Sequence, residues 1–306
     1  MHSDRLHGLD NLRGLAALMV VIYHAEIVVG GQRLIGHGYL AVDFFFALSG
    51  FVMTRTYEGR FQGALAFGAM RLTRFAPVMA CGSVLGFFAL GPSVGWSNAL
   101  FLAVLSLLYI PLPSREHPLI PANPPQWSIL FELIANLLHA AILARLRVTA
   151  LIAIMLISAA LILVFAEKPD DPALFLPRTL LSYCAGIVLC RTRHRLPNVP
   201  YVLAPLLLLG WPLAADVWPL LGWLFVLAGP AVIVLAGLTS SKVWPLAGPL
   251  SFPLYAVHYP VLVMAQNNQV SPWLGVVGAI AVALGVTAIF ERNALTQSFR
   301  NRTTAP

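Results

Sequence analysis

Charged residues are scarce in this chain: 10% of its 306 residues are Asp, Glu, Lys or Arg, whereas 59% are apolar. A soluble globular domain carries charge on about a quarter of its residues, so this composition excludes one. The 12 acidic residues are outnumbered by 19 basic ones. No long basic run or aromatic-interleaved basic patch accompanies this excess, which argues against nucleic acid as a partner. The excess instead indicates arginines retained on the cytoplasmic side of a membrane.

Cysteine is equally rare, since only Cys81, Cys184 and Cys190 are present and all lie in apolar stretches. They form neither a disulfide framework nor a zinc-ligand spacing. With no metal-ligand cluster elsewhere, we expect no permanently bound cofactor. The first apolar stretch lacks a small-x-small cleavage site and is long enough to span, so no cleaved signal peptide is predicted. Because repeats and soluble appendages are also missing, residues 1–306 are expected to form one transmembrane domain.

Apolar runs of about 17–25 residues, long enough to cross a bilayer, predict an all-α polytopic membrane protein with a bundle of about ten transmembrane helices. They lie near residues 11–29, 38–57, 75–91, 128–144, 149–166, 174–190, 201–215, 218–238, 248–266 and 272–290. A tight link at Ala214-Ala215-Asp216 separates the seventh run from the eighth. An eleventh candidate, residues 96–110, is short and stops at two prolines.

The distribution of basic residues decides the topology. If residues 96–110 do not cross and both termini are cytoplasmic, every basic residue except Arg33, Arg115, Lys168 and Arg178 lies inside, as the positive-inside rule requires. Residues 92–126 are then an outer excursion, and re-entry into the bilayer is left open. Its proline-rich segment, residues 111–127, cannot be regular helix. Two readings stay open: this segment covers an internal cavity, or it is an ordinary surface loop.

The first apolar run has Arg13 near its start and His24 well inside it. Eleven residues are close to three helical turns, so both side chains are predicted on one helix face. Ionisable residues inside a membrane are costly and mark functional sites by default. His24 is a candidate general base, because imidazole titrates near neutral pH. The alternative is a structural histidine held by a neighbouring helix.

Carboxylates occur in two other runs. Glu132 is predicted at the level of His24, where it would orient the ring and stabilise its charged form. The alternative is a carboxylate at a helix N-terminus. Asp43 opens the second run and is either a second such carboxylate or a cap. Ser49-Gly50 lacks the G-x-S-x-G pattern of a nucleophile and is more typical of close helix packing.

The remaining polar candidates lie near the ends of the runs or within them. Arg71 and Arg74, three residues apart, suit a phosphate-bearing ligand or serve only as topology determinants. His258, in the ninth run, lines a cavity or packs in the core. Arg178 is expected to pair with a carboxylate on the outer side.

Five motifs, in order, resemble acyltransferase family 3, the bacterial inner-membrane enzymes that O-acylate surface and secreted glycans. They are LDNLRGLAALMVVIYH with its Arg-x10-His, VDFFFALSGFVM, RLTRFAP, WSILFE and SFPLYAVHYPV. The resemblance runs nearly end to end. It departs at Glu291-Arg292-Asn293, where the family often has Glu-Lys-Pro.

This resemblance implies acyl-CoA, usually acetyl-CoA, as a cytoplasmic co-substrate and a glycan or other exported hydroxyl as the acceptor. It implies catalysis by His24 with Glu132 or Asp43, donor binding by Arg13, Arg71 and Arg74, and substrate contacts from His258, Trp127, Ser128 and Tyr255. The main alternative is a transporter or flippase that uses the same residues as a substrate or proton path. A third possibility is a non-catalytic structural partner in a membrane complex.

Overall fold

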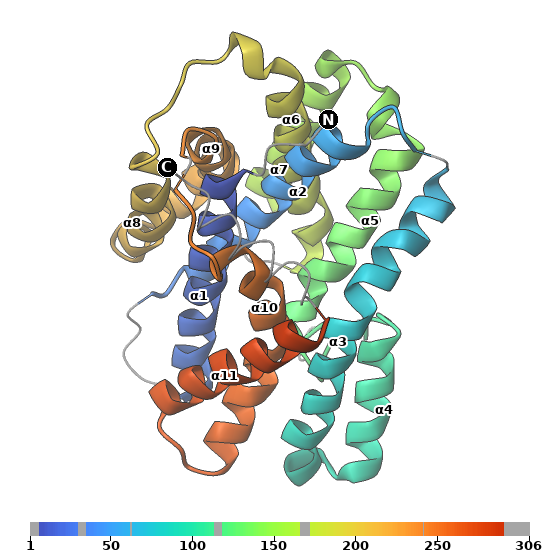
Figure 1. The fold of residues 1–306 in the computed structure, drawn as a ribbon, viewed down its shortest axis with the longest axis vertical. Helices are drawn as coiled ribbons and strands as arrows, with labels where there is room; N and C mark the ends of the chain where they lie inside the picture. The colour runs from blue at the N-terminus through green and yellow to red at the C-terminus, as the bar shows by residue number, and fades with distance from the viewer. Residues whose placement is uncertain are drawn as a thin grey trace. The chain divides into compact units, whose positions relative to one another are not determined.

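The computed structural model describes residues 6–29, 35–61, 63–112, 118–165, 172–240 and 242–290. Within these ranges every regular element is a helix (Figure 1), which confirms the all-α prediction. The α-helices are α1 (His7–Val29), α2 (Ala41–Tyr57), α3 (Ala64–Val94), α4 (Trp96–Leu107), α5 (Trp127–Ala141), α6 (Val148–Phe165), α7 (Phe175–Thr192), α8 (Leu203–Val217), α9 (Pro219–Gly237), α10 (Ala247–Asn267) and α11 (Pro272–Phe290).

Each apolar run overlaps one of these helices. Five of the helices are long and apolar enough to cross a bilayer. These are α1, α3, α6, α9 and α11. The chain is therefore a helical membrane protein, while the count of ten spans and the cytoplasmic termini stay predictions. The ends of the chain, including Glu291-Arg292-Asn293, lie outside the described residues. Helix α4 has 12 residues and is about 18 Å long, too short for a hydrocarbon core of about 30 Å.

Two boundaries differ from the sequence-based expectation. The break between α8 and α9 falls at Trp218, whose φ of −123° and ψ of 93° are extended, and not at Ala214-Ala215-Asp216. The following Pro219 explains the shift, because a proline disfavours helical backbone in the residue before it. Helix α3 begins at Ala64 and not near residue 75. Arg71 and Arg74 therefore lie within a continuous helix.

The chain packs as two compact units; three of the five boundaries between them fall inside α1, α3 and α5, and the other two follow Ile35 and Lys242. Unit 1 contains the described residues of Met1–Leu12, Gly36–Leu72 and Phe131–Lys242. Unit 2 contains those of Arg13–Ile35, Thr73–Leu130 and Val243–Pro306.

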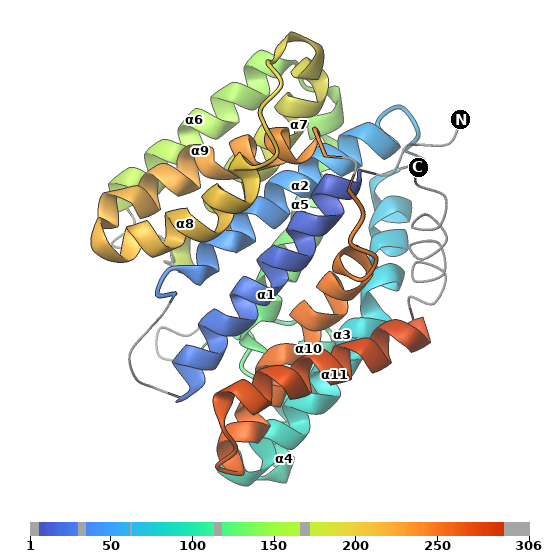
Figure 2. The same ribbon diagram turned by 60° about the vertical axis from the view of Figure 1, so that its left-hand side comes forward.

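In unit 1, α7 packs against α2, α6 and α9, and α8 lies beside α9 (Figure 2). The crossing of α2 and α7 depends on glycine. A Cβ atom on Gly186 would overlap the carbonyl oxygen of Ala47, and one on Gly50 would overlap that of Tyr183. Such close backbone approach is typical of small residues in membrane helices. The packing interpretation of Gly50 is thus confirmed.

In unit 2, α10 and α11 form a helical hairpin (Figure 1), and α1 packs against α10. A Cβ atom on Gly14 would lie 2.7 Å from the Cα atom of Ala247, so the two backbones nearly touch there. Ten residues further along α1, His24 meets His258 of α10. Residue numbers increase along both helices from the first contact to the second, so α1 and α10 run in the same direction. Their side chains face each other over about three turns.

The glycine crossing yields a stability prediction. Gly186→Ala should lower the free energy of unfolding by about 1–3 kcal/mol, because the added methyl group has to separate α2 from α7. Gly210→Ala in α8 is the matched control, since a Cβ atom there meets nothing within 4 Å and alanine is the better helix former. Thermal unfolding in detergent measures both. Equal stability of the two variants would contradict the glycine crossing.

Candidate functional site

The site in unit 2 is a pair of histidines on α1 and α10. Nδ1 of His24 lies 3.0 Å from Nε2 of His258 and 2.9 Å from the carbonyl oxygen of Val20, one turn earlier. His258 is fully buried, while His24 is half-buried. The ring of Tyr259 stands edge-on to His24, with 5.4 Å between the ring centroids. Both histidines were predicted as site residues from the sequence, and the fold brings them into contact.

Helix α10 connects this pair to the start of α5. Nδ1 of His258 lies 2.8 Å from the carbonyl oxygen of Tyr255, whose hydroxyl lies 2.7 Å from Oγ of Ser128. Both hydroxyls are also within hydrogen-bond distance of the carbonyl oxygen of Pro125. Ser128 and His258 therefore both contact Tyr255, the first through the phenol hydroxyl and the second through the backbone carbonyl, and His258 contacts His24.

The described part of the proline-rich segment is partly buried within unit 2: Asn123, Pro125 and Gln126 are buried, whereas Pro118 is exposed. Asn123 donates its side-chain N–H to the carbonyl oxygen of Ala256 at 2.8 Å. That carbonyl would otherwise lack a helical partner, because Pro260, four residues later, has no N–H. Gln126 donates to the carbonyl oxygen of Ser106 in α4 at 2.6 Å. These bonds favour an interior position over an ordinary surface loop, and they fix the segment next to Tyr255.

Asp43 of unit 1 is held by an arginine. Arg178 donates from Nε to Oδ1 at 2.7 Å and from Nη2 to Oδ2 at 2.6 Å, and both side chains are buried. The ring of Tyr39 lies 5.3 Å from the guanidinium carbon. This two-bond geometry is the strongest form of an ion pair between these side chains. It confirms the predicted pairing of Arg178 with a carboxylate and connects α2 to α7.

Glu132 of unit 1 also has two partners. Ser49 donates its hydroxyl to Oε1 at 2.7 Å, and Nη2 of Arg71 lies 3.4 Å from the same oxygen. Arg71 is buried, whereas Arg74 is exposed. The two arginines that were predicted together as donor ligands therefore have different surroundings. Ser49 acts here as a hydrogen-bond donor to a carboxylate, a contact that its sequence pattern gave no reason to expect.

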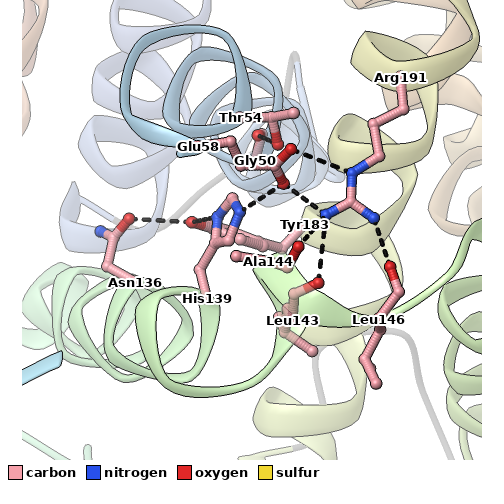
Figure 3. A network of polar contacts seen from close by, with 10 residues as sticks. All are labelled: Gly50, Thr54, Glu58, Asn136, His139, Leu143, Ala144, Leu146, Tyr183 and Arg191. Carbon is pink, nitrogen blue, oxygen red and sulfur yellow. Dashed lines mark hydrogen bonds and ion pairs between the residues drawn. The ribbon is translucent and has the colours of Figure 1, made fainter. Parts of the chain in front are cut away.

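A third polar cluster in unit 1 was missed from the sequence (Figure 3). Nε2 of the buried His139 lies 3.1 Å from Oε1 of Glu58, and its Nδ1 lies 3.0 Å from the hydroxyl of Tyr183. Tyr183 donates to Asn136 at 3.0 Å. Arg191 donates to both oxygens of Glu58, at 3.2 and 2.5 Å, and to backbone carbonyls that follow α5. His139 could have been found by the rule that identified His24, as an ionisable residue in an apolar run.

The other candidates are placed as follows. Arg13 in α1 and Trp127 in α5 are both half-buried. Support of the His24 ring by Glu132 or Asp43 stays a prediction; those carboxylates belong to unit 1 and bond Ser49, Arg71 and Arg178 there. Among the described residues, no group of three or more His, Cys, Asp or Glu side chains could hold a metal ion.

Comparison with known proteins identifies the chain. A family model described as an acyltransferase domain, that of acyltransferase family 3, matches residues 6–292. The chain belongs to this acyltransferase family. The acyltransferase is also similar to a protein named "Protein 2 in picA locus" from Rhizobium radiobacter. The two are 31% identical over 187 residues, which cover 54% of this chain and 96% of the relative. No solved structure matches the acyltransferase.

The Asp43–Arg178 pair predicts how the acyltransferase responds to losing one charge. Asp43→Asn should lower the free energy of unfolding by about 3–5 kcal/mol, because Arg178 is left buried without its counter-charge. The double variant Asp43→Leu/Arg178→Leu removes both charges and should be more stable than Asp43→Asn. Thermal unfolding in detergent compares them. An Asp43→Asn variant as stable as wild type would show that the pair is not required for folding.

Glu58 predicts a dependence of stability on pH. Its burial alone would raise the pKa of the carboxyl, but the hydrogen bonds and charges of His139 and Arg191 lower this pKa below its ordinary value. A carboxyl with a lowered folded-state pKa stabilises the fold above the ordinary pKa, and loses this effect as the pH falls through the folded-state pKa. The melting temperature should therefore decrease as the pH is lowered below about 4.3. The fall should be smaller in Glu58→Gln. Identical pH profiles for both proteins would contradict this account.

Proposed function

We propose that this acyltransferase transfers an acyl group from cytoplasmic acyl-CoA to a hydroxyl of a glycan or another exported acceptor, with His24 as the general base. The expected donor is acetyl-CoA, and the expected location is the bacterial cytoplasmic membrane. The observation that carries the proposal is the half-buried His24, held by His258 and Val20 on a helix long enough to cross a bilayer. Imidazole is the side chain best suited to proton transfer near neutral pH.

In the proposed reaction the His24 ring takes the proton of the acceptor hydroxyl as its oxygen attacks the thioester carbonyl carbon. The tetrahedral intermediate collapses, the carbon–sulfur bond breaks, and the imidazolium returns the proton to the sulfur of CoA. The products are the acyl ester and free CoA, and the enzyme ends in its starting protonation state. Direct transfer of this kind needs no nucleophile from the protein.

Donor binding is proposed for Arg13, Arg71 and Arg74, because guanidinium groups pair with phosphate through charge-assisted hydrogen bonds. Their surroundings support different roles. Arg74 is exposed, whereas Arg71 is buried and bonds Glu132. We therefore assign the phosphates of CoA chiefly to Arg74. Arg71 contributes positive charge and holds Glu132 in place. Arg13 lies on the same helix as His24.

The acceptor is assigned to the residues around His258. The hydroxyls of Ser128 and Tyr255 and the indole N–H of Trp127 are groups that can bind a sugar by hydrogen bonding. Tyr255 contacts both Ser128 and His258, and His258 contacts His24, which supports their grouping with the base. Glu132 is the proposed additional support for the charged imidazole, while its bond to Ser49 orients it. The match to an acyltransferase domain favours this enzyme over the transporter alternative.

The test is release of CoA from acetyl-CoA by the purified protein in nanodiscs, measured with a thiol reagent and a panel of hydroxylated acceptors. His24→Ala should lower kcat by about a hundredfold to ten-thousandfold, the usual contribution of a general base. His194→Ala is the matched control, because His194 is exposed. Full turnover by folded His24→Ala would refute the role of His24 as base. If wild type releases no CoA, longer acyl-CoAs are the next donors, and failure with all of them would refute acyl-CoA dependence.

A further inference from the structure

The contacts of the two histidines determine where their protons lie. Nδ1 of His258 faces the carbonyl oxygens of Tyr255 and Leu254, at 2.8 and 3.1 Å. Nδ1 of His24 faces the carbonyl oxygen of Val20 at 2.9 Å. A carbonyl oxygen only accepts hydrogen bonds, so each Nδ1 carries a hydrogen. Because a neutral imidazole has a single N–H, Nε2 of both rings is bare.

The contact between the rings therefore has one direction. Nδ1–H of His24 donates to Nε2 of His258, and it shares its hydrogen with the carbonyl oxygen of Val20. The lone pair of His258 is used in this bond. Nε2 of His24 has no hydrogen-bond partner within the described part of the chain. The pair thus presents one free basic nitrogen, and that nitrogen belongs to the half-buried ring and not to the fully buried one.

We propose that His258 is a positioning residue for His24: it accepts from Nδ1, keeps Nε2 of His24 bare, and retains this bond when Nε2 takes a proton. The proposal rests on the proposed function of His24 as base. In a Ser-His-Asp triad, a carboxylate accepts the hydrogen bond from Nδ1 and orients the ring. Here a neutral ring accepts this hydrogen bond in place of a carboxylate. His258 itself gains and loses no proton during the reaction.

The surroundings of His258 fit a ring that has to stay in one orientation. Two carbonyl oxygens of its own helix hold its Nδ1. The same Tyr255 bonds Ser128 through its hydroxyl. Asn123 donates to the carbonyl oxygen of Ala256, the residue after Tyr255, which Pro260 leaves without a helical donor. The ring is therefore held by carbonyls of α10, and this part of α10 is bonded to α5 and to the proline-rich segment.

The proton positions can be measured without any substrate. Protein labelled with 15N-histidine and placed in nanodiscs gives ring-nitrogen NMR signals that differ for protonated and bare nitrogens, and His24→Gln and His258→Gln assign them. We expect Nδ1 protonated and Nε2 bare in both rings. A proton on Nε2 of neutral His24 would overturn the proposal. Because no turnover is involved, this result is independent of whether acyl-CoA is the donor.

Kinetics then separate positioning from simple packing. His258→Leu fills the space without an acceptor, whereas His258→Gln can place its amide oxygen near the position of Nε2. We expect His258→Leu to lower kcat by about tenfold to a hundredfold with little change in KM for acetyl-CoA, and His258→Gln to keep most of the activity. Wild-type kcat in His258→Leu would overturn the proposal. Equal loss in both variants, together with a lower melting temperature, would instead assign His258 to packing.

Discussion

An ionisable side chain inside a bilayer has to find its partner within the protein, because the hydrocarbon offers none. This constraint explains the polar contacts of the acyltransferase. Asp43 is paired with Arg178, and Glu132 with Arg71, so these carboxylates meet opposite charge. His24 instead meets a second histidine, whose ring is neutral in the proposed arrangement of protons. A neutral partner satisfies the ring without fixing a charge on it, which leaves the ring able to exchange a proton.

Close backbone contact makes these pairings possible. Glycine at positions 14 and 186 allows α1 to approach α10 and α2 to approach α7 until only backbone separates them. Side chains further along the same helices then meet directly, His24 with His258 and Asp43 with Arg178. The proline-rich segment also contributes to this packing, because Asn123 supplies the hydrogen bond that a proline in α10 removes. Packing and site chemistry are therefore set by the same few contacts.

Apolar run length predicted the helices well, because burial in lipid requires long uninterrupted apolar stretches. It misplaced the α8–α9 break, where Pro219 and not the small residues before it decides the backbone. Single site residues such as His24 could be recognised as ionisable groups in apolar runs. Their partners could not, since His258 is 234 residues away and no local pattern encodes that contact. His139 was missed although the same rule applied to it.

The central claim is that Nε2 of His24 is the nitrogen that meets the reacting groups. The most direct test is a cryo-electron-microscopy structure of the protein in nanodiscs with a non-cleavable thioether analogue of acetyl-CoA. The account predicts that the acyl end of the analogue lies beside Nε2 of His24, with the CoA phosphates at Arg74. An analogue bound with its acyl end away from His24 would contradict it.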